Sequence, residues 1–347
     1  VGLRFRSTRL LASKLLVDHF VWVEGEGHGE SWFELYERAL ANCPTEELAL
    51  RFWLSGRYGR LLFRAHRYAE ALQQHERALS LAHQLNQPDL LAQAHLYLGA
   101  DFWQQHENEL ARSHAEQALT YLAQAEAPPD RFADAWQLLG LIGDQQGDLA
   151  AGEQAYRQAV AYRRLAAQPH ALAHELNNLA NLYQKQRRWE LAASNYEEAL
   201  AVLPIEAYPV IAAAIYNSLG TLHFNLDRLE EAHDAFREAA RRYERLPGQT
   251  TRSALVLTNL GQLSLKLGQL PATLDYLQRA ATIWRQYGQL LWLANVLGGL
   301  AEYFQRTGNL VQARSLYEEA IELLAAFPDN DWARKWTADF KEALAGL

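Results

Sequence analysis

The chain has 347 residues, of which 49% are hydrophobic and 21% are charged, and its formal net charge is −8 at pH 7. This composition is that of a soluble protein with enough apolar material for a sizeable core, and the acidic balance argues against nucleic acid as the main partner. The single cysteine, Cys43, excludes an intrachain disulfide, and no apolar run reaches the roughly 18 residues of a membrane-spanning helix, so we expect a cytoplasmic protein.

The first 45 residues predict one divergent structural unit. Trp32, Tyr36 and Ala39 in the stretch ESWFELYERAL follow the spacing of an amphipathic helix. The preceding stretch, VEGEGHGE, departs from this pattern and leaves the first member of the helix pair undefined. The chain begins with Val1 and contains no methionine, which is typical of a fragment of a longer polypeptide.

From residue 46 to residue 327 the sequence contains seven similar units. A small residue recurs every 40 or 41 residues, and an alanine follows 19 residues after each of them. A register kept over seven units indicates a repeat architecture. The small residues are Gly59, Gly99, Gly140, Ala180, Gly220, Gly261 and Ala301, and the alanines are Ala78, Ala118, Ala159, Ala199, Ala239, Ala280 and Ala320.

Each unit predicts two helices. In the fourth unit the apolar residues from Leu172 to Tyr183 recur at i, i+4, i+7 and i+11, which is one face of a helix. A polar turn, QKQRR, separates them from a second apolar stripe that begins at Trp189. Most prolines lie between units, where a helix has to end. The last stretch, DWARKWTADFKEALAGL, predicts one amphipathic helix that covers the apolar face of the final unit.

The units resemble the tetratricopeptide repeat. In YNSLGTLHFNLDRLEEAHDAFREAA the matching residues are Leu219, Gly220, Leu229, Ala232, Phe236 and Ala239. The long period is similar to that of kinesin light chains and bacterial signalling proteins. The resemblance implies an all-α fold, namely a right-handed α-solenoid or superhelix of about seven to eight helix pairs. It implies a single domain over residues 1–347, composed of the divergent unit 1–45, the repeats 46–327 and a capping helix in 328–347.

Polar residues form a second stripe on the first helix of the fourth unit, about 200° of rotation from the apolar stripe. In tetratricopeptide arrays the first helices line the concave surface, so the resemblance places this stripe in a groove that binds a protein or peptide ligand. Asparagine amides can clamp a peptide backbone, as they do in kinesin light chains. The other interpretation is that these residues are simply exposed or bond to neighbouring units. The predicted ligand-binding residues are Asn177, Asn178, Asn181, Lys185, Asn217, Thr221, Asn225, Asn259, Gln262, Lys266, Arg57, Arg60, Arg64 and Trp103.

The sequence contains no phosphate-binding loop, nucleophile elbow or zinc-protease motif, so it predicts no enzyme, no cofactor and no metal site. The repeats resemble the C-terminal sensor arrays of bacterial STAND-type signalling ATPases, in which an NB-ARC nucleotide-binding switch stays inactive until an inducer binds. This implies an inducer-sensing, autoinhibitory domain that follows an N-terminal nucleotide-binding module in the full-length chain. The alternative is a stand-alone adaptor that binds extended peptides or helices of partner proteins. Neither implies direct contact with nucleic acid or membranes.

Overall fold

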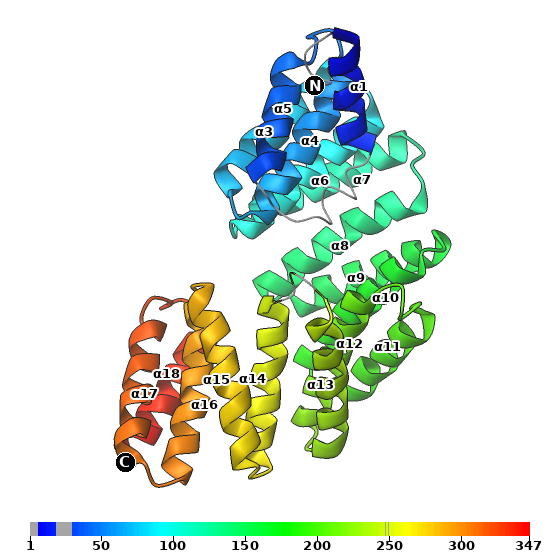
Figure 1. The fold of residues 1–347 in the computed structure, drawn as a ribbon. Helices are drawn as coiled ribbons and strands as arrows, with labels where there is room; N and C mark the ends of the chain where they lie inside the picture. Colours follow the sequence, from blue (N-terminus) through cyan, green and yellow to red (C-terminus); the bar gives the residue numbers. More distant parts are fainter. Residues whose placement is uncertain (1–5, 19–29, 247, 249) are drawn as a thin grey trace. The chain divides into compact units, whose positions relative to one another are not determined.

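All regular structure in the described part of the chain is helical (Figure 1). The computed structural model describes residues 6–18, 30–246, 248 and 250–347. Within these ranges no helix is both long enough and apolar enough to cross a membrane. The irregular stretch VEGEGHGE lies, except for its last residue, outside the described residues.

The chain divides into two compact units, each of which contains several repeats. From here on, "unit" refers to these two parts, and the first comprises Val1–Gln186. Its helices are α1 (Arg6–Asp18), α3 (Glu30–Asn42), α4 (Leu48–Arg64), α5 (Tyr68–Leu85), α6 (Pro88–Gln104), α7 (Asn108–Gln124), α8 (Pro129–Gln146), α9 (Leu149–Leu165) and α10 (Pro169–Lys185). Proline occupies the first turn of α6, α8 and α10, where its missing N–H has no helical partner to lose.

The second unit comprises Arg187–Leu347. Its helices are α11 (Trp189–Val202), α12 (Pro209–Asn225), α13 (Leu229–Glu244), α14 (Thr250–Lys266), α15 (Leu270–Gln286), α16 (Leu290–Arg306), α17 (Leu310–Leu324) and α18 (Asp331–Ala345). The expectation that the whole chain is one domain stays a prediction.

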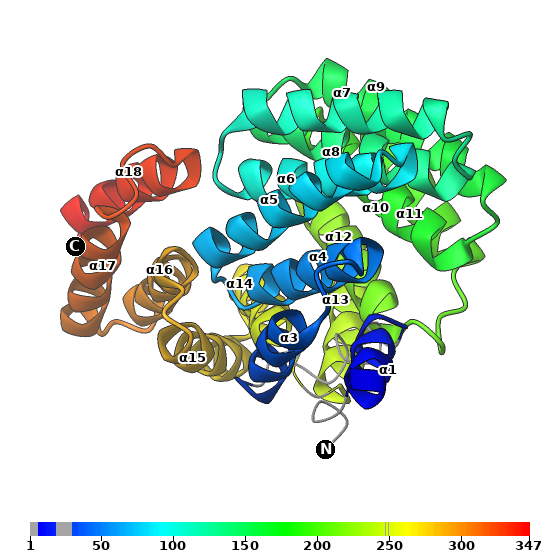
Figure 2. The same ribbon diagram turned by 90° about the horizontal axis from the view of Figure 1, so that it is seen from above.

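Neighbouring helices pack as pairs. In the first unit α4 packs with α5, α6 with α7 and α8 with α9, and in the second unit α12 packs with α13, α14 with α15 and α16 with α17. Second helices also pack against the first helix of the next pair, and first helices contact each other from α4 to α6 and α8 and from α12 to α14 and α16. Figure 2 shows α7 and α9 along one side of the first unit, with α6 and α8 beside them. The predicted all-α solenoid of helix pairs is therefore confirmed.

The recurring small residue of the first helix lies where a large side chain of the second helix crosses it. A Cβ added at Gly140 would lie 2.5 Å from the Tyr156 ring, and one at Gly220 would lie 2.6 Å from the Phe236 ring. These positions must stay small because the interior is close-packed. The alanines of the second helices are all fully buried, namely Ala78, Ala118, Ala159, Ala199, Ala239, Ala280 and Ala320.

The turn inside each pair has one residue in the left-handed region of backbone conformation. The seven residues recur with the period of the repeat and have φ between 57° and 82°. They are His66, His106, Gly147, Arg187, Asp227, Gly268 and Gly308. The same backbone reversal therefore connects the helices of every pair, although only three of the residues are glycines, for which it is unstrained.

Both ends of the array depart from the regular pair. At the N-terminal end α1 and α3 pack on α4, and Tyr36 is fully buried, with its hydroxyl donating to the Leu16 carbonyl at 2.8 Å. At the C-terminal end α18 packs against α17 and α16, and the Phe340 ring occupies the space over Gly298. α18 begins 41 residues after α16, so it holds the place of a further first helix.

Candidate ligand-binding clefts on the first helices

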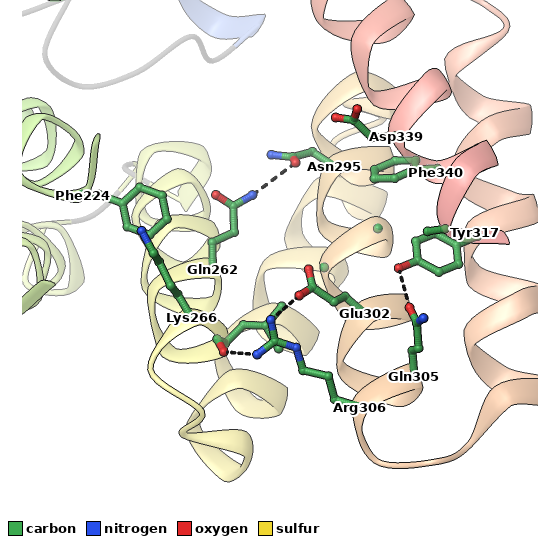
Figure 3. Close-up of a pocket in the computed structure, with 14 residues that line it drawn as sticks. Phe224, Gln262, Lys266, Asn295, Glu302, Gln305, Arg306, Tyr317, Asp339 and Phe340 are labelled. Carbon is green, nitrogen blue, oxygen red and sulfur yellow. Dashed lines mark hydrogen bonds and ion pairs between the residues drawn. The ribbon is translucent and has the colours of Figure 1, made fainter. Parts of the chain in front are cut away.

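The second unit has a cleft on the side formed by its first helices (Figure 3). Its volume is about 560 Å³, and its walls come from α12, α14, α16, α17 and α18. Two of the predicted residues, Gln262 and Lys266, lie on the α14 wall. The lining residues are Phe224, Gln262, Leu265, Lys266, Asn295, Gly298, Gly299, Glu302, Gln305, Arg306, Tyr317, Asp339, Phe340 and Ala343.

Side-chain amides of consecutive first helices bond to each other in the second unit. The Asn259 Nδ2 on α14 donates to the Asn217 Oδ1 on α12 at 2.8 Å. The Gln262 Nε2 donates to the Asn295 Oδ1 on α16 at 3.2 Å. Each amide has a limited set of donors and acceptors, so these bonds reduce what remains for a ligand. Three predicted residues thus connect neighbouring repeats, as the second interpretation of the polar stripe proposes.

Two predicted lysines at the ends of first helices pair with acids of the preceding repeat. The Lys185 Nζ lies 2.6 Å from the Asp144 Oδ1 in the first unit. The Lys266 Nζ lies 2.6 Å from the Asp227 Oδ1 in the second unit, and 4.9 Å from the centre of the Phe224 ring. Each lysine also complements the carbonyl end of its own helix. Both positive charges are therefore already balanced within the protein.

The wall formed by α16 and α18 carries two carboxylates in different surroundings. Glu302 accepts a hydrogen bond from Arg306 at 2.5 Å, and Arg306 also donates to the Leu265 carbonyl at 2.7 Å. Asp339 on α18 is exposed and forms no hydrogen bond or ion pair within the described part of the chain. The Tyr317 hydroxyl donates to the Gln305 side chain at 3.3 Å. The cleft therefore has one carboxylate that the protein leaves unpaired.

The first unit has a second cleft, of about 420 Å³, on the side of α4, α6 and α8. The predicted residues Arg60 and Arg64 lie on its α4 wall. The lining residues are Arg60, Phe63, Arg64, His75, Gln93, Leu96, Tyr97, Ala100, Asp101, Asp134, Gln137, Leu138 and Leu141. Apolar side chains and a cationic edge thus share this surface.

A buried histidine–aspartate pair forms part of this wall. The His75 Nδ1 lies 2.6 Å from the Asp101 Oδ2, and both side chains are at most 2% exposed. The other ring nitrogen lies 3.3 Å from the Gly56 carbonyl, and the ring stacks on Tyr97. Burial raises the pKa of Asp101, while the hydrogen bond from His75 opposes this rise. Both ring nitrogens of His75 are therefore occupied by contacts within the protein, whereas the Asp101 Oδ1 has no hydrogen-bond partner among the described residues.

The asparagines of α10 have different surroundings. Asn177 is only 9% exposed, and its Oδ1 accepts no hydrogen bond in the described structure. The Asn178 Nδ2 lies 3.4 Å from the His174 Nδ1 and 3.5 Å from the Glu175 Oε2. Asn181 is half-buried. Asn178 and Asn181 therefore present partly accessible amides on α10, whereas Asn177 is packed inside.

Four other predicted residues line neither cleft. The Thr221 hydroxyl donates to a backbone carbonyl of its own helix at 3.1 Å, and Asn225 is exposed at the end of α12. The Arg57 guanidinium lies 5.4 Å from the centre of the Trp53 ring. Trp103 packs against the hydrophobic cluster of α6, α7 and α8. Their roles in ligand binding stay predictions.

Sequence reasoning missed several cleft residues. Asn295 stands outside the four repeat positions from which the amides were selected, but it lies 121 residues after His174 and so occupies the same place in the repeat, and it contacts Gln262. Asp339 and Phe340 lie on α18, which the sequence predicts only as a cap. Counting α18 as a further first helix would have found both, because Phe340 lies 41 residues after Gly299.

The repeats belong to a known family. Models of the tetratricopeptide repeat match residues 133–164, 171–245 and 250–326, which span most of the helices from α8 to α17. The chain is therefore a tetratricopeptide-repeat protein. No curated protein matches its sequence.

Solved structures share the fold at low sequence identity. The apo form of the quorum sensor NprR from B. thuringiensis is 16% identical with a TM-score of 0.67, over 92% of this chain and 87% of that chain. A Rap protein complexed with competence and sporulation factor is 15% identical with a TM-score of 0.61, over 98% of both chains. BtubC (BKLC) from P. vanneervenii is 22% identical with a TM-score of 0.53, over 65% of this chain and 91% of that chain. These likenesses establish the fold alone.

Proposed function

We propose that this chain is a non-catalytic scaffold that binds a segment of another protein, as an extended peptide or a helix, on its first helices. The observation that carries the proposal is the presence of a cleft on the first-helix side of each unit, with volumes of about 560 and 420 Å³. Clefts of this size, lined by apolar and polar residues in about equal numbers, suit side chains of a bound peptide. The Rap structure, whose protein is complexed with a factor, supports this by analogy of fold.

Within this function, we infer that the array senses an inducer for a bacterial STAND-type ATPase and keeps it inactive until the inducer binds. This finer role rests on the resemblance of the long repeats alone. The alternative is a stand-alone cytoplasmic adaptor for partner proteins. Sequencing the coding region upstream of Val1 distinguishes the two. A phosphate-binding loop followed by a winged-helix segment supports the sensor, and a start codon at this point supports the adaptor.

A phage-displayed library of random peptides tests the binding function. We expect peptides to be enriched on the wild-type protein and to lose affinity for the Asn295→Trp variant, because the indole would occupy the cleft of the second unit. The matched control is Gln278→Trp on α15, an exposed position outside both clefts. Two results would contradict the proposal. The first is a library in which no peptide is enriched. The second is a set of enriched peptides whose affinity is unchanged by Asn295→Trp and also by Ala100→Trp, which would fill the cleft of the first unit.

A further inference from the structure

The geometry points to a cationic subsite in the cleft of the second unit. We propose that Asp339 holds the basic side chain of a lysine or arginine in a bound peptide, while Asn295 donates to its backbone. This inference rests on the proposed peptide-binding function and names the chemistry of its ligand at one position.

The cations of this cleft have protein partners, so they are poor anchors for an acidic ligand. Lys266 contacts Asp227 at 2.6 Å and lies over the Phe224 ring. Arg306 donates to both Glu302 and the Leu265 carbonyl. An acidic ligand would have to break these contacts or share them, whereas a basic ligand leaves them in place. The electrostatic balance of the cleft therefore favours a positive charge.

Asp339 supplies the uncompensated negative charge. It lies on α18 at the edge of the cleft and is exposed, with no ion pair in the described part of the chain (Figure 3). Glu302 lines the same cleft from α16, where Arg306 already balances its charge. A basic side chain that enters between α16 and α18 can thus donate a charge-assisted hydrogen bond to the Asp339 carboxylate.

The remaining walls suit the rest of such a residue. The Phe340 and Tyr317 rings lie 5.7 Å apart and both line the cleft, so they can cover the aliphatic stem of a lysine or arginine. The Asn295 Oδ1 accepts from Gln262, and this acceptor role directs its Nδ2 donors elsewhere. Those donors bond to nothing among the described residues and are available to a peptide carbonyl.

Fluorescence anisotropy with labelled, acetylated and amidated peptides tests the subsite. The two probes are an arginine–alanine repeat peptide and a glutamine–alanine repeat peptide of equal length, both measured at physiological salt. We expect the arginine peptide to bind more tightly. Asp339→Asn should weaken it by about twofold to fivefold, the range for an exposed ion pair, and leave the glutamine peptide unchanged. The control is Asp329→Asn, which removes the same charge at an exposed position outside the cleft.

Equal weakening by Asp339→Asn and Asp329→Asn would overturn the subsite, because only net charge would then matter. Equal affinity for the two peptides, or no binding of the arginine peptide, would overturn it as well. The proposed function would survive each of these results if library peptides still lost affinity for Asn295→Trp. It would fail separately if no library peptide were enriched. Thermal melting of each variant shows that the cleft is still folded.

Discussion

At the scale of single residues, each helix pair needs one residue in the left-handed conformation at the turn between its helices. His106 has φ 63°, and Gly147, at the same place in the next pair, has φ 75° with no atom near its missing Cβ. A residue with a side chain costs about 1 kcal/mol or more in this region. We therefore expect His106→Gly to raise the free energy of unfolding by about 1 kcal/mol and Gly147→Ala to lower it by a similar amount, as measured by urea denaturation. Changes of the same sign in both variants would contradict this account.

Another residue-scale feature is a pair of histidines between α6 and α7, of which His95 is buried and His114 is half-buried. The His95 Nδ1 lies 2.8 Å from the His114 Nδ1, and the rings stack on Tyr121 and Phe102 respectively. Burial, with repulsion from His114 and from His83 on α5, lowers the pKa of His95 to about 4. Burial also lowers the pKa of His114. One shared proton satisfies this contact, and a second proton would break it.

From the low pKa of His95 we expect the folded protein to lose stability in acid. The unfolded chain takes up a proton on His95 near pH 6.5, whereas the folded chain does so only near pH 4. The unfolded state therefore binds more protons in this window, so stability is greatest above it and falls as the pH is lowered through it, by roughly 2–3 kcal/mol. The urea midpoint measured between pH 7 and pH 4.5 should depend less on pH in His95→Gln. The exposed His106→Gln serves as the control and should retain the dependence.

At the scale of elements, the Asn217–Asn259 hydrogen bond connects α12 to α14. Replacing either residue with alanine should lower the free energy of unfolding by about 1 kcal/mol, and the double variant should cost less than the sum. Asn225→Ala, on the exposed end of α12, is the matched control and should change stability by less than about 0.5 kcal/mol. Additive, negligible losses together with a loss of peptide binding would instead assign the two amides to the ligand.

Other helix pairs have different residues at the two repeat positions that Asn217 and Asn259 occupy. Where Asn217 meets Asn259 in the second unit, the corresponding residues of α4 and α6 are Gly56 and Tyr97, and those of α16 and α18 are Gly298 and Phe340. In both glycine pairs the aromatic ring occupies the space that a Cβ would need. Consecutive first helices therefore contact each other at this position through either a pair of amides or a glycine and an aromatic ring.

At the scale of the whole molecule, the array needs a closed end. Deleting residues 328–347 would expose Gly298 and the apolar surface of α16 and α17 that α18 covers. Uncapped repeat ends lose stability and associate. We expect this truncation to lower the melting temperature of the second unit and to increase light scattering on heating. Lys341→Ala, on the exposed face of α18, is the control and should do neither.

The fold was predictable to a large extent because its signals are local and repeated. The interval between Gly140 and Gly220 and the burial of Ala159 follow from helix pairs of constant length, and each pair repeats the information. The site was less predictable. Whether Lys266 and Asn259 face a ligand or a neighbouring repeat depends on contacts between residues about 40 positions apart, and helical spacing carries no information about such contacts.

The sequence by itself determined the period, the small crossing positions, the turns and the closing helix, since each follows from helix geometry and from the space available where two helices cross. Only the tertiary structure decided which polar groups are already paired and which remain open. It also brought Asp339 on α18 to the edge of a cleft that is lined by α12, α14 and α16. The physical reason is that hydrogen bonds and ion pairs between neighbouring repeats depend on how one helix pair is positioned against the next. The periodicity of the sequence does not specify that position.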